Sequence, residues 1–351
     1  MKKFFAAANT EHGFRSLFDE VFTPDAFRRI YILKGGPGTG KSTLMSEIGS
    51  VAQAKGYDVE YICCSSDPDS LDGIVISELA VAFLDGTSPH TTDPIYPGAV
   101  ERIVDLGNAF DFDLLEKKKH ELIPMIRAKK EAYRAAYRFL SAMGKMEKEQ
   151  DETLRQMYLE EKAHAAVGRL IASFQNAVKG GERKRYISSI CEAGYHRLDT
   201  LHGQAKKIYA VTDKNGTGYL FMNTLYQRLH REGFSMTICP CPVTEERTEA
   251  IFLRGEEILF VISKDETETA SADKIINSLR FVDQAKLASV KNRLRFAGKC
   301  RAFIREGAVS CFAEASAWHA KTEKIYGACV NFSEIDRMTG KIIDEIFANN
   351  V

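Results

Sequence analysis

The sequence predicts an α/β protein made of two similar units in tandem, each a parallel β-sheet followed by a long helical region. Two observations carry this prediction: a glycine-rich turn joins an apolar strand to a helix near the N-terminus, and the same pattern returns in the second half of the chain. Apolar residues at helical spacing dominate the chain after each unit. The chain has 351 residues, of which 44% are hydrophobic, so it can bury one large core or two smaller ones.

The overall charge gives no sign of a nucleic-acid partner, and none is expected. Lys and Arg together number 48, as do Asp and Glu, so neither a basic nor an acidic field surrounds the molecule. The first residues begin like an export signal, but Asn9 ends the apolar run 4–8, and no stretch of about 18 apolar residues predicts a membrane span. Eight cysteines in a chain of this length fit reduced thiols, so we expect a cytoplasmic protein.

The N-terminal turn carries the pattern of a phosphate-binding loop, or P-loop. Its sequence "GGPGTGKS", residues 35–42, matches the Walker A motif G-x-x-x-x-G-K-[ST], with a short strand at 30–33 before it and a helix after it that Gly56 ends. Glycines let successive N–H groups face an anion, and the N-terminus of the helix adds partial positive charge. The predicted nucleotide contacts are Gly35, Gly36, Pro37, Gly38, Thr39, Gly40, Lys41, Ser42 and Thr43.

The motif also predicts ATP and Mg²⁺ as ligands. Lys41 is expected to act in catalysis at the β- and γ-phosphates, and the Ser42 hydroxyl is expected to ligate Mg²⁺. Asp85 follows the apolar run 80–84, which is typical of a central parallel strand, so we predict that it holds Mg²⁺ through water. The alternative for Asp85 is an ordinary turn aspartate.

The group that orients the attacking water is open. Gly86 follows Asp85 at the position where many ATPases carry a glutamate. We take His90 as the catalytic candidate, although a lone histidine in a loop also serves as a packing residue. Four carboxylates remain as alternatives: Asp67, Asp69, Glu78 and Asp93.

The second glycine-rich turn is interpreted as a degenerate copy of the first. Aligning Ile30 with Ile208, a shift of 178 residues (208 minus 30), places "RIYILKGGPGTGKSTLM" over "KIYAVTDKNGTGYLFMN". Each lost charge-assisted hydrogen bond is worth about 1.5–3 kcal/mol, so we predict that the second copy binds no triphosphate and persists as a packing partner. Binding of another ligand is the alternative. Gly35, Lys41, Ser42 and Asp85 are replaced there by Asp213, Tyr219, Leu220 and Ser263.

Apolar spacing predicts helices after each unit. Residues 113–146 and 152–176 are expected to form an α-hairpin packed on the first sheet, with Pro124 kinking or dividing its first helix. Residues 275–347 are again mostly helical, and "VKGGERKRY", residues 178–186, is expected to be a linker.

These features divide the chain into two predicted domains. Residues 1–178 form the domain with the intact Walker A motif and a helical hairpin at about 113–176, and residues 179–351 form the domain with the degenerate motif and a helical C-terminal region. The two domains are expected to pair as an internal pseudo-dimer.

A basic run with tyrosines lies at residues 127–138. At helical spacing the tyrosines fall on the apolar face, which favours a solvated helix over a nucleic-acid contact. The run also offers three candidates for an arginine that reaches over a nucleotide: Arg127, Arg134 and Arg138. The degenerate copy adds two more, Arg228 and Arg254.

Cysteines recur at equivalent places in the two copies, namely Cys63 and Cys64, and Cys239 and Cys241. Neither pair has the C-x₂₋₄-C spacing of a zinc site. We therefore expect small buried thiols rather than a zinc ligand set.

Several segments resemble an uncharacterised bacterial family of tandem P-loop ATPases within the P-loop NTPase superfamily. They are "GGPGTGKSTLM", "SSDPDSLDG" at residues 65–73, "DGTSPH" and "DPIYPGAV" at residues 93–100, together with the second glycine-rich turn. The resemblance implies ATP binding and ATPase activity. In that family the second copy often keeps the full Walker A motif, and this sequence departs from it at Asp213, Tyr219 and Leu220.

The expected function is therefore a Mg²⁺-dependent ATPase with one active and one degenerate site, acting as a conformational switch toward an unknown protein partner. ATP is favoured over GTP because we find no N-K-x-D motif in the first copy. One alternative is a small-molecule or nucleotide kinase that uses the same loop. Another is a non-enzymatic scaffold stabilised by ATP.

Overall fold

The apolar strands of the N-terminal half form a six-stranded sheet. A computed structural model describes residues 1–174, 178–263 and 265–347 of the chain. The strand order of the first sheet is β1-β5-β6-β7-β4-β8. Its strands are β1 (Lys2–Phe5), β4 (Arg29–Lys34), β5 (Val59–Cys63), β6 (Leu71–Ile76), β7 (Val81–Asp85) and β8 (Glu101–Asp105).

The C-terminal half forms a second six-stranded sheet, in the order β16-β12-β15-β14-β13-β9. Strand β12 lies between β15 and β16, just as β4 lies between β7 and β8, which fits the predicted duplication. The α/β class and the two similar halves are thus confirmed. The strands are β9 (Glu182–Lys184), β12 (Lys207–Thr212), β13 (Met236–Pro240), β14 (Thr248–Leu253), β15 (Ile258–Ser263) and β16 (Lys274–Asn277).

Both sheets are mixed, so the prediction of parallel sheets is wrong at one strand of each. Strand β6 is antiparallel to β5 and β7, and β14 is antiparallel to β13 and β15. Only residues 64–70 separate β5 from β6, and residues 77–80 separate β6 from β7. Connections this short cannot make the crossover that parallel neighbours need.

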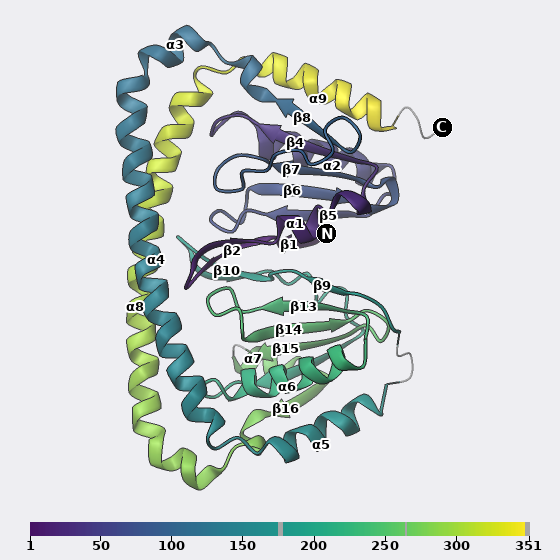
Figure 1. The fold of residues 1–351 in the computed structure, drawn as a ribbon, viewed down its shortest axis with the longest axis vertical. Helices are drawn as coiled ribbons and strands as arrows, with labels where there is room; N and C mark the ends of the chain where they lie inside the picture. The colour runs from purple at the N-terminus through teal and green to yellow at the C-terminus, as the bar shows by residue number, and fades with distance from the viewer. Residues whose placement is uncertain (175–177, 264, 348–351) are drawn as a thin grey trace.

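Two long helices run along both sheets, as Figure 1 shows. Helix α4 (Lys119–Arg155, 37 residues) follows the short α3 (Phe112–Lys117), and α8 (Gln284–Gly327, 44 residues) packs beside it. The predicted hairpin of residues 113–146 and 152–176 is therefore wrong: the partner of α4 is α8, from the other half. Residues 175 and 176 lie outside the described residues. Pro124 lies near the start of α4 and does not divide it, because few backbone bonds precede it there.

The two halves exchange their terminal helices. Helix α5 (Glu160–Ile171) packs against α6 (Thr217–Arg231) on the second sheet, while α9 (Phe332–Phe347) packs against α2 (Lys41–Ala54) on the first (Figure 1). A division at residue 178 therefore describes the sequence repeat and not the packing. None of the described helices is both long and apolar enough to span a lipid bilayer.

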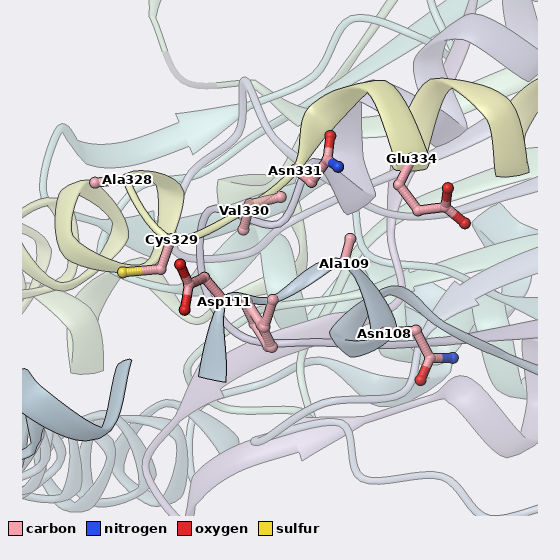
Figure 2. Close-up of a pocket in the computed structure, with 9 residues that line it drawn as sticks. Asn108, Ala109, Asp111, Ala328, Cys329, Val330, Asn331 and Glu334 are labelled. Atoms are coloured by element: carbon pink, nitrogen blue, oxygen red, sulfur yellow. The ribbon is translucent and has the colours of Figure 1, made fainter. Parts of the chain in front are cut away.

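A backbone hydrogen bond joins the two halves at equivalent places, where each long helical region meets the other half. The N–H of Asp111 donates to Cys329 O at 2.8 Å, and the N–H of Asp283 donates to Met157 O at 2.9 Å. At the first of these places, residues 108–111 and 328–331 line a pocket of about 600 Å³, into which Glu334 also projects (Figure 2). Each half therefore receives a terminal helix from the other half, and the same kind of backbone contact accompanies both.

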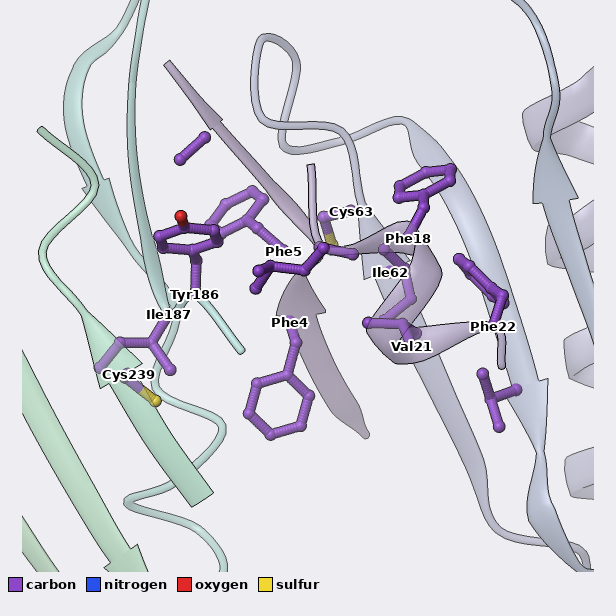
Figure 3. Packing of buried hydrophobic residues seen from close by; sticks show 14 of the residues in the cluster. Phe4, Phe5, Phe18, Val21, Phe22, Ile62, Cys63, Tyr186, Ile187 and Cys239 are labelled. Carbon is purple, nitrogen blue, oxygen red and sulfur yellow. The ribbon is translucent and has the colours of Figure 1, made fainter. Parts of the chain in front are cut away.

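The two sheets share an apolar core. Phe5 and Ile62 of the first half lie in one cluster with Tyr186 and Cys239 of the second, as Figure 3 shows. Two hairpins border this core, β2 (Ala7–Thr10) with β3 (Gly13–Ser16), and β10 (Ser188–Cys191) with β11 (Gly194–Arg197). The short helices α1 (Phe18–Val21) and α7 (Glu266–Ala270) complete the fold.

The predicted linker is part of this ordered interface. Residues 182–184 form the edge strand β9, and the Arg185 side chain pairs with Glu60 at 2.6 Å across the two halves. Phe5 and Tyr186 exchange backbone hydrogen bonds of 2.8 and 2.9 Å. The linker prediction is therefore wrong for this segment: its charges belong to an edge strand, where charged side chains limit pairing with other chains.

Candidate functional site

The first glycine loop, residues 35–40, joins the carboxyl end of β4 to α2. Gly38 has φ +71° and Gly40 has φ +83°, a left-handed conformation that side chains with a Cβ atom rarely adopt. Thr39 is buried, and its hydroxyl donates to Gly36 O at 2.9 Å. The sequence thus places glycine where the backbone turn requires it.

Three predicted site residues converge on this loop. Lys41 Nζ lies 3.0 Å from Gly36 O and 3.6 Å from Asp85 Oδ2. Asp85 ends β7, which pairs directly with β4, so the sheet itself brings this carboxylate to the loop. The Ser42 hydroxyl lies at the first turn of α2 and accepts a 3.0 Å hydrogen bond from Leu71 N.

The other Asp85 oxygen is held by its own turn. Asp85 Oδ1 accepts hydrogen bonds from the Thr87 backbone N–H at 2.8 Å and from the Thr87 hydroxyl at 2.6 Å. The oxygen that faces Lys41 is therefore Oδ2. The predicted role of Asp85 and Ser42 at a metal ion stays a prediction, and this pair supplies the oxygen ligands that Mg²⁺ takes.

His90 lies in an aromatic environment. Its ring stacks on Phe18 at 4.3 Å between centroids and meets Phe14 edge-on at 4.8 Å. His90 Nε2 is 3.1 Å from Asp72 Oδ2, and both side chains are buried. Asp72 follows Leu71, so His90 is linked to Ser42 through one strand rather than by direct contact. Its catalytic role stays a prediction.

The alternative carboxylates are dispersed. Glu78 accepts from Asp58 N at 3.2 Å, and the fully exposed Asp93 lies 3.7 Å from Lys34 Nζ. Asp67 accepts from Asp69 N at 3.3 Å, and burial raises the pKa of the Asp67 carboxyl. Of these groups, Asp67 has the environment that suits a general base.

Helix α8 covers the first glycine loop, a contact that the sequence analysis missed. A Cβ atom on Gly36 would lie 3.0 Å from the Tyr326 ring, and one on Gly38 would lie 2.7 Å from Glu323 O. The loop backbone therefore touches a helix from the other half of the chain. The regular spacing of apolar residues in α8 predicts a helix, but it does not predict which part of the protein that helix packs against.

Side chains of α4 and α8 meet beside Glu323, whose backbone oxygen lies against Gly38 of the loop. Lys129 Nζ lies 3.2 Å from His319 Nδ1, and His319 Nε2 lies 3.5 Å from Glu323 Oε1. Burial, with the charges of Lys129 and Lys41, lowers the pKa of His319 to about 4, so its ring is neutral at pH 7 and accepts from Lys129. Burial also lowers the pKa of Lys129, with Lys41 adding to the effect and Glu323 opposing it.

None of the predicted arginines shares this position. Arg127 and Arg138 are exposed, and Arg134 pairs with Glu131 on the same exposed face. In the second half, Arg228 pairs with Glu232, and Arg254 donates to Ser235 and Gly181. The tyrosines of the basic run pack against Phe312 of α8, as expected from their spacing.

The second glycine loop, residues 213–218, is filled by its own side chain. Asp213 Oδ1 accepts from Gly218 N at 2.8 Å, and Oδ2 accepts from Gly216 N at 3.3 Å. Burial raises the pKa of this carboxyl, while the two N–H donors and Arg247 oppose the rise. A carboxylate therefore occupies the N–H groups at the start of α6 that an external anion would need.

Arg247 is the centre of a buried ion network next to the second loop. Its guanidinium makes two hydrogen bonds to Asp151, at 2.8 and 2.9 Å, and lies 3.1 Å from Glu147 Oε2. It also lies over the ring of Tyr219, which replaces the first-copy lysine. Two acids of α4 thus hold Arg247 beside Tyr219, the residue that follows the second loop.

The cysteines are free thiols, and Cys63, Cys239 and Cys241 are buried, as expected, whereas Cys64 is half-buried. Over residues 1–174, 178–263 and 265–347, one set of His, Cys, Asp or Glu side chains is close enough together to hold a metal ion. It consists of Glu11, His12 and Glu246. Lys148 Nζ lies 2.9 Å from Glu11 Oε1 and supplies the opposite charge there. Because the buried Glu11 carboxylate is already paired with Lys148, we assign this group no metal.

Comparison with known proteins gives no relative: the chain matches no family model, no curated protein and no solved structure.

Proposed function

We propose that the protein is a Mg²⁺-dependent ATPase with one working site at the first glycine loop. The observation that carries the proposal is the approach of Lys41 Nζ to 3.6 Å from Asp85 Oδ2, across two paired strands and beside a left-handed glycine turn. A lysine and a hydroxyl at the start of a helix, with a carboxylate at the end of a neighbouring strand, are the groups that hold a Mg²⁺-nucleotide in P-loop proteins.

In this proposal the loop N–H groups and Lys41 bind the β- and γ-phosphates. Ser42 and Asp85 would hold Mg²⁺, whose charge stabilises the negative charge that develops on the transferring phosphoryl group. Asp67 or His90 would orient the attacking water. Slow hydrolysis would act as a switch, because the loop backbone touches α8 at Gly38 and α8 runs along both sheets.

The second glycine loop supports a single site per chain. Asp213 occupies its N–H groups, and Tyr219 replaces the lysine that would neutralise phosphate charge. A protein partner that responds to the switch, membership of the P-loop superfamily and a cytoplasmic location belong to the same proposal.

The test is calorimetric titration of Mg-ATP and Mg-GTP, with phosphate release followed in parallel. The wild type should bind one ATP per chain and release phosphate slowly, and Lys41→Ala should lose both properties. Lys299→Ala, an exposed lysine of α8, is the matched control and should behave as the wild type. Two ATP per chain would overturn the interpretation of the second loop.

Failure to hydrolyse would redirect the proposal. Tight binding with phosphate transfer to an added acceptor would identify a kinase. Tight binding without any turnover, accompanied by a higher melting temperature, would identify an ATP-stabilised scaffold. No binding by the wild type would overturn nucleotide binding altogether.

A further inference from the structure

The sequences of α4 and α8 can be aligned with a constant shift in residue number. The paired backbone bonds of Asp111 and Asp283 set the shift at 172 residues, the difference between 283 and 111. The same shift carries buried Ala136 onto buried Ala308, and buried Leu140 onto buried Phe312. The inner faces of α4 and α8 therefore correspond residue by residue, and position 129 of α4 corresponds to position 301 of α8.

Arg301 is the cation at this position in the second half, and nearby acids act on its charge. Burial lowers the pKa of Arg301, and the negative charges of Glu147 and Asp213 oppose that shift. Asp213 in turn sits on the N–H groups of the second glycine loop. A carboxylate on the loop and a cation from the long helix thus occur together.

Lys129 is the cation at the same position in the first half, and there the loop carries no acid. Gly35 stands where the second copy has Asp213, so no side chain of the loop fills the equivalent place. Lys129 Nζ lies 3.2 Å from His319 Nδ1, and the Glu323 carboxylate lies beyond that ring, 3.5 Å from His319 Nε2. His319 and Glu323 connect Lys129 to the loop, because the Glu323 backbone oxygen would lie 2.7 Å from a Cβ atom on Gly38. A loop of this kind is built to receive an anion.

We propose that Lys129 is a second phosphate-binding cation of the first site and contacts the terminal phosphate of the bound nucleotide. In the second half, Arg301 holds the position that corresponds to Lys129, and the Asp213 carboxylate accepts from the loop N–H groups that we assign to phosphate in the first half. The inference rests on the proposed function and adds a residue from α4 to the site.

Such a contact distinguishes a triphosphate from a diphosphate. Lys41 and the loop N–H groups serve both nucleotides, whereas a cation that reaches only the terminal phosphate serves ATP alone. When the terminal phosphate is present, Lys129 exchanges the His319 nitrogen for a charged oxygen, a stronger hydrogen bond. His319 then acts as the positioning residue that holds Lys129 over the empty site.

The experiment compares Mg-ATP and Mg-ADP affinities of Lys129→Met, with Lys130→Met as the control. Lys130 is the exposed neighbour on the same helix. Lys129→Met should weaken Mg-ATP binding about tenfold or more and Mg-ADP binding less than about threefold. Lys130→Met should change neither, and Lys129→Arg should recover most of the ATP affinity because it keeps the charge.

A second measurement avoids any effect of the substitution on folding. In the wild type, Mg-ATP should protect Lys129 from amine acetylation, read by mass spectrometry, while Lys130 reacts at its unliganded rate. Equal losses for Mg-ATP and Mg-ADP, or an unprotected Lys129, would overturn this inference alone. If the wild type bound neither nucleotide, the proposed function would fail first and this inference with it.

Discussion

The carboxylate of Asp213 accepts a 2.8 Å hydrogen bond from the backbone N–H of Gly218, at the first turn of α6. The same carboxyl group also accepts from Gly216 N, so the second glycine loop is closed by a side chain of its own. Where the first copy has Gly35, the second copy thus has an aspartate that makes an internal contact. This explains how the loop conformation persists in a copy that has lost its lysine.

Replacement of this carboxylate should destabilise the protein. Asp213→Ala leaves two buried N–H groups without an acceptor, so we expect a loss of about 1–3 kcal/mol in the free energy of unfolding. Denaturant unfolding monitored by circular dichroism measures it. Asp19→Ala, an exposed carboxylate of α1, should change the stability by less than about 0.5 kcal/mol. An unchanged Asp213→Ala midpoint would contradict the assigned contact.

The Arg247 network predicts a larger effect. Arg247 is buried between Asp151 and Glu147, so Arg247→Met would leave two acids of α4 without their cation. Breaking a buried network in this way costs about 3–5 kcal/mol. Arg102→Met removes an exposed pair with Glu345 and serves as the control, with an expected change below about 1 kcal/mol. Equal effects of both substitutions would show that Arg247 is not buried in solution.

His319 predicts a pH dependence of stability. Its folded-state pKa of about 4 lies below the ordinary value of 6.5, because of burial and the charges of Lys129 and Lys41, against the opposing charge of Asp67. The neutral ring therefore stabilises the fold above pH 6.5, and this contribution is lost as the pH falls toward 4. The side chain is 41% exposed, so solvent screening limits the expected loss to on the order of 1 kcal/mol.

Unfolding of wild type and His319→Gln at pH 7 and pH 4 checks this sign. The wild type should lose more stability between the two values than His319→Gln, because glutamine does not titrate. Glu323 lies 3.5 Å from the ring and is present in both proteins. A larger loss in His319→Gln would contradict the assigned direction.

The local parts of the site followed from the sequence. Gly35, Lys41 and Asp85 lie in short segments whose strand, turn and helix patterns depend on neighbouring residues, and the fold brings Lys41 and Asp85 together at 3.6 Å. Strand β6 was missed because the segment before it, residues 64–70, is rich in turn-forming residues. Nothing in that segment indicated that the chain returns antiparallel to β5. Its two antiparallel pairings then changed the sheet from parallel to mixed.

Lys129 was overlooked although its position carried a signal. It lies seven residues after Leu122 and seven before Ala136, both buried, and therefore on the inner face of α4. A charged residue on an apolar stripe marks either a paired charge or a ligand contact, whereas the exposed arginines of the run lie on the solvated face. Charge alone does not distinguish Lys129 from the exposed arginines. The position of each residue around the helix axis does.

The exchange of α5 and α9 was beyond local reasoning, because an apolar stripe shows that a helix is covered but not by which sheet. It now makes opposite predictions for two substitutions. Ile342→Ala in α9 removes buried contacts of the first core, and Leu170→Ala in α5 removes buried contacts of the second. Each should cost about 2–5 kcal/mol.

Hydrogen exchange locates the damage from these two substitutions. With helix exchange, Ile342→Ala should speed amide exchange in α2, far away in the sequence, and leave α6 protected, while Leu170→Ala should do the reverse. If each half packed only on itself, Ile342→Ala would instead loosen α6 and Leu170→Ala would loosen α2. Because the two variants are equally conservative, only the location of the faster amides separates the two arrangements. The pattern in α2 and α6 therefore tests whether each glycine loop is held by a helix from the other half.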